Sequence, residues 1–307
     1  MSLKKRRIIF IFCALAFFVS VPFLLCYTNG YRWSYELGIY KTGGLYITSP
    51  LNGTRISINN VQKKETGIFQ SGLFLQNLKP NTYAVLASKE GYWPWSKKLK
   101  VREQLVTEAR AMLMPQNPKG EIIAQEKDGS IKNPIYQKIL IDLQNTAKGN
   151  FTVDIEEVTK GTKTSTSTEK TTKTTEIKEN PHLRFSFDLK EKLWWDKTEN
   201  KLWAEWIKNN EDLPYFFCKD DGTCEEKVLI LDSIFSVRSI DFYPKRREVV
   251  VVSINNGVYA IEIDGRGGRI IQPIYKGKNP VSLVYEKESA IFILETEEKT
   301  FMKIILE

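Results

Sequence analysis

The most constraining feature of the sequence is an uncharged run of 20 residues at positions 8–27. A helix rises about 1.5 Å per residue, so this run spans about 30 Å, the thickness of the hydrocarbon core of a bilayer. The run is apolar on every side, whereas a core helix of this length normally has a polar face. We therefore predict a transmembrane helix over residues 8–27, in which a kink at Pro22 is tolerated.

A cleaved signal peptide is the alternative to an anchor. The apolar region of a signal peptide spans about 7–15 residues and is followed by a small-x-small cleavage site. The run in this chain is longer, and residues 24–30 contain no such site. Cys26 follows the bulky Leu25, which disfavours lipidation at this cysteine. An uncleaved anchor is the interpretation that fits these features best.

The charges around the run predict its orientation. Four basic residues at positions 4–7 precede it, and basic flanks stay in the cytoplasm. Residues 1–7 are therefore expected to be a cytoplasmic stub, and the bulk of the chain to lie outside the cytoplasm at the cell membrane. The juxtamembrane segment, residues 28–40, contains aromatic side chains that suit the headgroup region, namely Tyr31, Trp33 and Tyr35.

The net charge of +8 does not indicate nucleic-acid binding. Residues 8–307 carry 41 of the 45 Lys and Arg residues against 37 Asp and Glu, a charge of only +4. This charge is too dilute for a nucleic-acid surface, which needs clustered cations. The single histidine, His182, excludes sites that need two. No sequence feature indicates a cofactor.

Short predicted strands alternate with turn residues across residues 41–115. A strand at 44–49 is followed by a turn at 50–53 and by an alternating polar and apolar strand at 54–58. Strands with turns every 8–12 or so residues are typical of β-sandwiches.

Four short motifs occur in order within this segment: Ser49-Pro50-Leu51-Asn52-Gly53-Thr54, Asn59-Asn60, Leu78-Lys79-Pro80-Asn81-Thr82-Tyr83 and Glu90-Gly91-Tyr92. As a set they resemble the PEGA domain, in which a Ser-Pro turn, a Leu-x-Pro-Gly-x-Tyr motif and a Gly-Tyr pair separate the strands. Asn81 stands where the family has Gly, and no Gly-x-x-Pro follows Asn60. The resemblance implies a small β-sandwich that serves as an interaction or spacer module on extracytoplasmic proteins.

Two different segments connect this unit to the rest of the chain. In residues 116–158, Asn133 and Pro134 favour the start of a short amphipathic helix, although residues 139–141 fit a strand equally well. Residues 159–180 are rich in Thr and Lys and almost free of apolar side chains, which predicts a disordered linker or loop.

Residues 181–307 contain a repeated pattern of an apolar end, a charged turn and a strand. The equivalent positions Asp196, Tyr243 and Tyr285 are 47 and 42 residues apart, close to the spacing of about 40–50 residues between propeller blades. The pattern resembles periplasmic propeller-repeat families and predicts a propeller-like antiparallel β-domain, with a plain β-sandwich as the alternative. Three units are fewer than the 4–8 or so blades of a closed ring. Either strands from residues 119–158 complete a blade, or the array is partial.

Two groups of aromatic residues are the candidate binding residues: Tyr92, Trp93 and Trp95, and Trp194, Trp195 and Trp203. Flat rings stack on sugars and on partner side chains. The alternative is that these side chains fill the cores of the sandwich and of the repeats, because tryptophan is usually mostly buried.

Cys218 and Cys224 flank an Asp-Gly turn, so a hairpin would bring their sulfur atoms together. This spacing favours a disulfide in an oxidising compartment, with two free thiols as the alternative. Two cysteines without a second ligand pair do not complete a tetrahedral zinc site, and no metal site is predicted.

The sequence contains no assembled set of nucleophile, base or metal ligands, so no catalytic residue is predicted. We expect a mainly β, single-pass membrane protein that binds a protein or glycan at the cell envelope and is not an enzyme. One alternative is a cell-wall glycan hydrolase whose acids, such as Asp196 or Asp220, come together only in the fold. Another is a structural spacer.

Overall fold

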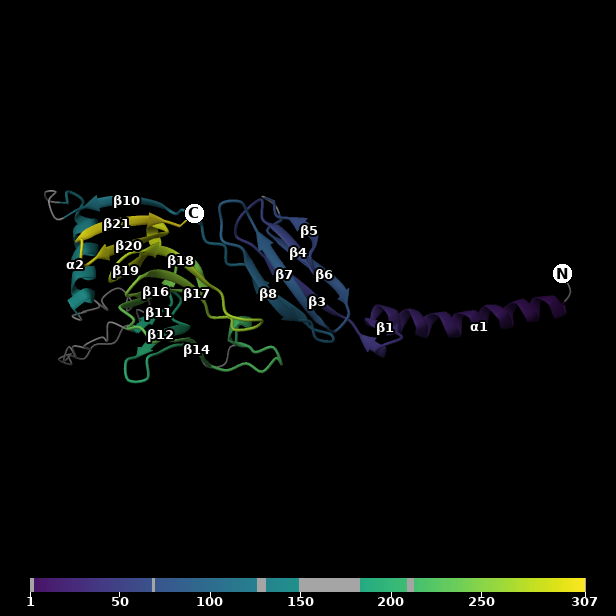
Figure 1. Ribbon diagram of the computed structural model, residues 1–307. Helices are drawn as coiled ribbons and strands as arrows, with labels where there is room; N and C mark the ends of the chain where they lie inside the picture. The colour runs from purple at the N-terminus through teal and green to yellow at the C-terminus, as the bar shows by residue number, and fades with distance from the viewer. Residues whose placement is uncertain (1–2, 68–69, 126–130, 149–182, 209–212, 307) are drawn as a thin grey trace, which may run out of the picture. The chain divides into compact units, whose positions relative to one another are not determined.

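The computed structural model describes residues 3–67, 70–125, 131–148, 183–208 and 213–306. The linker predicted at residues 159–180 and His182 lie outside the described residues. The chain is mainly β, with one N-terminal apolar helix and several sheets (Figure 1). It divides into two compact units: Met1–Glu90 with Pro94–Leu113 and Arg266–Gly268, and Gly91–Trp93 with Met114–Gly265 and Arg269–Glu307.

α1 (Leu3–Thr28) forms where the uncharged run predicts a helix. Among the described residues it is the one helix long and apolar enough to cross a membrane, and the rest of the chain does not bury Lys5–Thr28. Its exposed side chains include large apolar ones, among them Phe10, Phe12 and Phe18. An apolar surface of this extent is stable in hydrocarbon rather than in water, so α1 has the surface of a membrane span.

A short hairpin, β1 (Tyr31–Ser34) and β2 (Gly38–Lys41), follows α1. The guanidinium of Arg32 lies 3.6 Å from the centre of the Tyr27 ring, at the end of the helix. The aromatic residues predicted to suit the headgroup region are exposed here, namely Tyr31, Trp33 and Tyr35. Exposed rings and cations directly after an apolar helix are typical of the membrane–water interface.

Seven further strands of the first unit form two sheets, in the orders β6-β3-β9 and β5-β4-β7-β8. Each sheet buries one face, as at Leu45 and Ile47 in the first and at Ile56 and Val85 in the second. Residues 41–115 thus form two β-sheets with buried apolar faces, and their packing as a small β-sandwich stays a prediction. The strands span Gly43–Thr48 (β3), Arg55–Ile58 (β4), Val61–Glu65 (β5), Gly72–Leu78 (β6), Thr82–Ser88 (β7), Trp95–Lys100 (β8) and Val106–Arg110 (β9).

A buried cluster of hydroxyl groups closes the Ser-Pro turn between β3 and β4. The hydroxyls of Ser49 and Thr54 lie 2.9 Å apart, and both side chains are buried. The hydroxyl of Thr66 accepts a hydrogen bond from the Thr54 N–H at 2.9 Å and donates to the Leu51 carbonyl at 2.7 Å. Because buried polar groups need partners, these residue types fix the shape of the turn.

Three four-stranded antiparallel sheets make up most of the second unit, in the orders β11-β12-β13-β14, β15-β16-β17-β18 and β10-β21-β20-β19. Two short 3-10 turns, η2 (Tyr215–Phe217) and η3 (Glu286–Glu288), lie between strands. The strands span Lys119–Ala124 (β10), Leu183–Phe185 (β11), Glu191–Asp196 (β12), Lys201–Trp206 (β13), Lys227–Asp232 (β14), Ser239–Tyr243 (β15), Arg246–Ile254 (β16), Gly257–Glu262 (β17), Ile271–Lys276 (β18), Pro280–Tyr285 (β19), Ala290–Glu295 (β20) and Thr300–Ile305 (β21).

The predicted repeat corresponds to these three sheets, but its first unit is shifted by one hairpin. β11, β15 and β19 each begin a sheet, and β11 lies beside β15, which lies beside β19. The hairpin equivalent to β15–β16 is therefore β11–β12, and not the β12–β13 hairpin that contains Asp196. The sequence hid this relation because β11 has only three residues, whereas β12 and β13 carry the conspicuous tryptophans.

A strand from before the repeats completes the third sheet. β10 pairs with β21, with Gly120 opposite Ile304. The sequence left two arrangements open. The structure has the first of them, in which a strand within residues 119–158 completes a sheet. The part of the chain that the structure describes contains no closed barrel or ring of blades, so the propeller resemblance stays a prediction.

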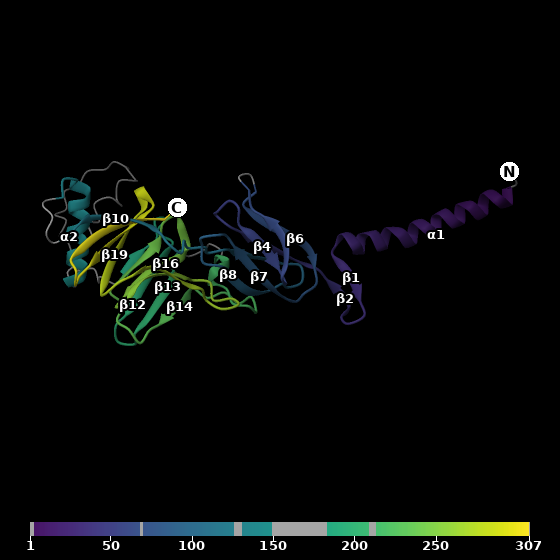
Figure 2. The same cartoon turned by 45° about the horizontal axis from the view of Figure 1, so that its top comes forward.

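α2 (Pro134–Lys148) is the helix expected after Asn133 and Pro134. The Asn133 side chain caps it by accepting a hydrogen bond from the Ile135 N–H at 2.9 Å. Figures 1 and 2 show α2 lying against the sheet that contains β19 and β20. Ile139 and Leu143 are buried against that sheet, so the alternative of a strand at residues 139–141 is wrong.

The packing of α2 predicts a large difference between two neighbouring aliphatic side chains. Leu143→Ala removes a fully buried side chain and should lower the free energy of opening of α2 by about 2–5 kcal/mol. Ile141→Ala, at a position that is 55% exposed, should lower it by less than about 0.5 kcal/mol. Amide hydrogen exchange along α2 in the full chain measures both, and equal losses would contradict the packing.

Candidate functional site

The predicted aromatic binding residues do not form one surface. Trp95 and Trp195 are 1% and 3% exposed, so the prediction that they bind a partner is wrong. Both lie in strands whose side chains alternate between faces, at positions that point into a core. Trp93 is 38% exposed and Tyr92, which pairs with Pro115, is half-buried.

Trp194 and Trp203 are the two predicted binding residues that the structure brings together. They lie opposite each other on β12 and β13, and their rings stack with centroids 6.1 Å apart. The ammonium of Lys227 lies 4.5 Å from one ring and 4.2 Å from the other. This cation–π contact engages both rings within the protein, which favours packing over an open platform for a sugar.

Cys218 and Cys224 are joined by a disulfide. The two residues form an isolated antiparallel bridge across the Asp-Gly turn, directly after η2. The bridge closes the turn at a point where Phe216 and Phe217 enter the core. It ties an exposed loop to the core, and the described residues contain no group of three or more His, Cys, Asp or Glu side chains that could hold a metal ion.

The acids proposed for a glycan hydrolase are turn residues. The Asp196 carboxylate accepts hydrogen bonds from the hydroxyl of Thr198 at 2.6 Å and from its N–H at 2.9 Å, which lower the pKa of Asp196. Asp220 is exposed in the turn between the two bonded cysteines. These contacts give Asp196 a structural role in its turn.

Three turns of the second unit meet beside a cavity of about 500 Å³. An ion pair of 2.7 Å between Asp188 and Arg247 links the β11–β12 turn to the start of β16. The Lys245 N–H donates to the Glu286 carboxylate at 3.3 Å and links the β15–β16 turn to η3. The corrected repeat explains this meeting, because all three turns follow the first strand of a sheet.

Glu191 is a fully buried carboxyl group behind these turns. Its nearest cation is Arg247, 3.5 Å away, and neither carboxyl oxygen has a hydrogen-bond donor among the described residues. Desolvation raises the pKa of Glu191 to about 8, against the opposing charge of Arg247. Sequence reasoning missed this residue because it ends a charged turn and resembles a solvated acid.

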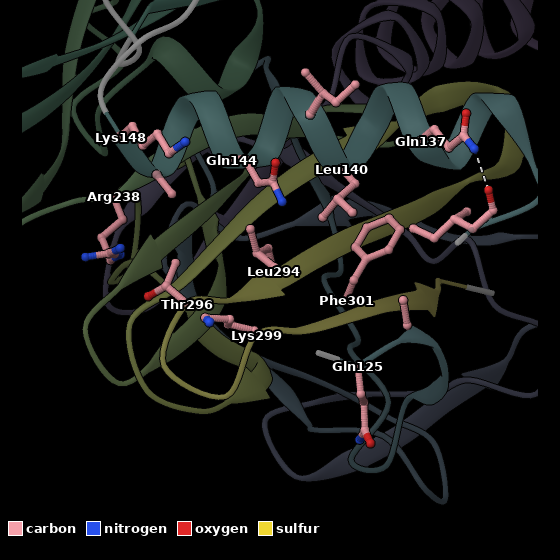
Figure 3. Close-up of a pocket in the computed structure, with 14 residues that line it drawn as sticks. Gln125, Gln137, Leu140, Gln144, Lys148, Arg238, Leu294, Thr296, Lys299 and Phe301 are labelled. Carbon is pink, nitrogen blue, oxygen red and sulfur yellow. Dashed lines mark hydrogen bonds between the residues drawn. The ribbon is translucent and has the colours of Figure 1, made fainter. Parts of the chain in front are cut away.

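A larger cavity of about 910 Å³ runs along one side of α2 (Figure 3). Ile139 and Leu143, on one face of α2, pack on the sheet. The neighbouring face of α2 lies beside this contact, and the cavity forms beneath it. The sheet side of the cavity includes Ala124 on β10, Leu294 on β20 and Phe301 on β21. The stripe of α2 that lines it consists of Gln137, Leu140, Ile141, Gln144, Ala147 and Lys148.

This α2 groove, defined by the residues that line the larger cavity, has an apolar middle and polar ends. Figure 3 places Leu140, Leu294 and Phe301 in the middle and Gln137 at one end. Lys148 and Arg238 lie at the other end. An apolar cavity of this size with a few polar groups at its rim is typical of ligand sites.

Comparisons with known proteins do not assign a family. No family model and no curated protein matches the chain. Among solved structures it is similar to a protein of unknown function from Bacteroides fragilis that is provisionally described as membrane-associated. The two are 10% identical, with 86% of this chain and 98% of the other covered, at a TM-score of 0.20. Likeness at this level carries no argument, so the function is argued from the chain itself.

The burial of Glu191 predicts a pH-dependent stability. The folded chain holds a proton up to about pH 8 that an unfolded carboxyl releases above its ordinary pKa of 4.5. Stability from this group is therefore complete below about pH 4.5 and is lost as the pH rises through about 8, by roughly 5 kcal/mol at about 1.4 kcal/mol per pKa unit. Glu191→Gln, which stays neutral, should not show this loss.

Denaturant unfolding of the full chain at about pH 5 and about pH 9 measures the difference. The exposed carboxyl of Glu226 provides the matched control, because Glu226→Gln should follow the unsubstituted chain at both pH values. A Glu191→Gln chain that loses as much stability between the two pH values as the unsubstituted chain would show that this carboxyl ionises normally.

Proposed function

We propose that this chain is a single-pass, membrane-anchored extracytoplasmic binding protein that holds its ligand in the α2 groove. The α2 groove carries the proposal, because it is larger than the cavity at the turns and combines an apolar middle with polar ends. Its described lining contains no carboxylate, histidine or cysteine. This composition supports binding rather than acid–base or nucleophilic catalysis.

An apolar ligand fits the α2 groove better than a glycan does. Sugar sites combine exposed flat rings with many hydrogen-bonding groups, whereas Leu140 and Leu294 present aliphatic surface. The stacked pair Trp194 and Trp203 is already engaged by Lys227. We therefore narrow the ligand expected at the cell envelope to one with a substantial apolar part.

The two units have different roles in this proposal. The first unit, with its two small sheets, is a PEGA-like spacer next to the anchor, and the second is a propeller-like domain that carries the site. The basic residues 4–7 support a cytoplasmic N-terminal side for α1. The exposed rings of Trp33 and Tyr35 support an interfacial position for the hairpin that follows it.

The anchoring and orientation are tested by protease accessibility. Protease added to right-side-out membrane vesicles should digest the chain beyond residue 28, whereas a tag placed before α1 should resist until detergent is added. A chain that lacks residues 1–28 should leave the membrane fraction. If the bulk of the full chain resists protease until the membrane is dissolved, the orientation is wrong.

The binding site is tested by photolabelling with an uncharged probe, a long-chain alcohol that carries a diazirine. In the full chain in lipid nanodiscs, mass spectrometry should map labels to peptides that contain Leu140 or Phe301, besides those in α1. Leu140→Glu places a carboxylate in the apolar middle and should reduce the groove label several-fold. Ile135→Glu, on an exposed position of α2 outside the groove, should leave it unchanged. Equal labelling of both variants would contradict the site.

A further inference from the structure

Positive charge lies at one end of the α2 groove, which narrows the class of ligand. This argument rests on the proposed function, namely that the groove is a binding site. Its described lining contains the cations Lys148 and Arg238 at one end and no acidic residue. A cavity with cations and no acid attracts anions.

Arg238 is the most telling of these cations. Its Nε–H group is buried and has no hydrogen-bond acceptor among the described residues. Burial lowers the pKa of its guanidinium. A buried N–H group without an acceptor is unfavourable until a ligand accepts its hydrogen bond. Figure 3 shows Arg238 at the same end of the groove as Lys148 and Thr296.

The rest of the groove suits an alkyl chain. From Lys148 to Gln137 the helix covers about 16 Å, at about 1.5 Å per residue. Between these ends the groove is lined by Leu140 and Gln144 from α2 and by Leu294 and Phe301 from the sheet (Figure 3). An apolar channel of this length with cations at one end matches a single chain with an anionic head.

We propose that the α2 groove binds a long-chain fatty acid, with its carboxylate at Arg238 and Lys148 and its alkyl chain along Leu140 and Phe301 toward Gln137. A planar guanidinium offers paired donors to the two oxygens of a carboxylate. A phosphate head is the alternative anion, and a phosphate-headed probe in the experiment below distinguishes the two. The proposed anchor holds the chain at a membrane, and membranes are where fatty acids are concentrated.

The experiment compares two photoactivatable probes of equal length, a diazirine-bearing palmitic acid and the corresponding alcohol. Both are applied to the full chain in nanodiscs of uncharged lipid, and labels are mapped to peptides of α2, β20 and β21. The acid should label the groove at roughly tenfold lower concentration than the alcohol, the factor expected for one charge-assisted contact. Arg238→Met should remove this advantage of the acid and leave labelling by the alcohol unchanged.

Two further variants provide a second test of the anion site and a control. Lys148→Met changes an exposed side chain at the end of α2 and should reduce acid labelling in part, even if Arg238→Met alters the fold. Lys138→Met, on an exposed position outside the groove, should have no effect.

Equal labelling by acid and alcohol would overturn the fatty-acid proposal but keep the groove as a binding site. Stronger labelling by a phosphate-headed probe of the same length would overturn the choice of head group. Labelling of the groove by neither probe would overturn the proposed function itself.

Discussion

The α2 groove depends on the pairing of β10 with β21. Without β10, β21 would be the outermost strand of the third sheet, and Ala124 at the end of β10 would be missing from the lining of the groove. With β10 in place, Gly120 lies opposite Ile304 and the third sheet has four strands like the other two. α2 then packs on this sheet through Ile139 and Leu143, and its neighbouring stripe lines the groove. The candidate site therefore depends on a strand that lies outside the repeats.

The sequence predicted those features that depend on local patterns. The uncharged run located α1, Asn133 and Pro134 located α2, and the spacing of Cys218 and Cys224 suggested their disulfide. The features that it missed depend on which face of an element is buried. Trp95 and Trp195 are core residues because strand alternation turns them inward. No pattern in the sequence distinguishes such a tryptophan from one that faces solvent.

The candidate site itself could not be predicted in the same way. Arg238, Leu294 and Phe301 are far from α2 in the sequence, and only the packing of α2 on the third sheet brings them together. Glu191 and Arg247 likewise meet because the first strands of successive sheets are neighbours. The repeat in the sequence implied that equivalent turns meet. Because its first unit was assigned to the wrong hairpin, the meeting of Glu191 and Arg247 could not be predicted. The two clusters differ chemically, since Glu191 is a buried carboxyl group whereas the α2 groove is an open cavity with the cations Lys148 and Arg238 in its lining.

The pairing of Gly120 with Ile304 also bears on the order in which the second unit folds. Because synthesis proceeds from the N-terminus, β10 and α2 are made well before β19, β20 and β21. During that interval β10 has no strand to pair with, and α2 has no sheet to cover its buried side chains. The α2 groove is therefore among the last features of the second unit to mature.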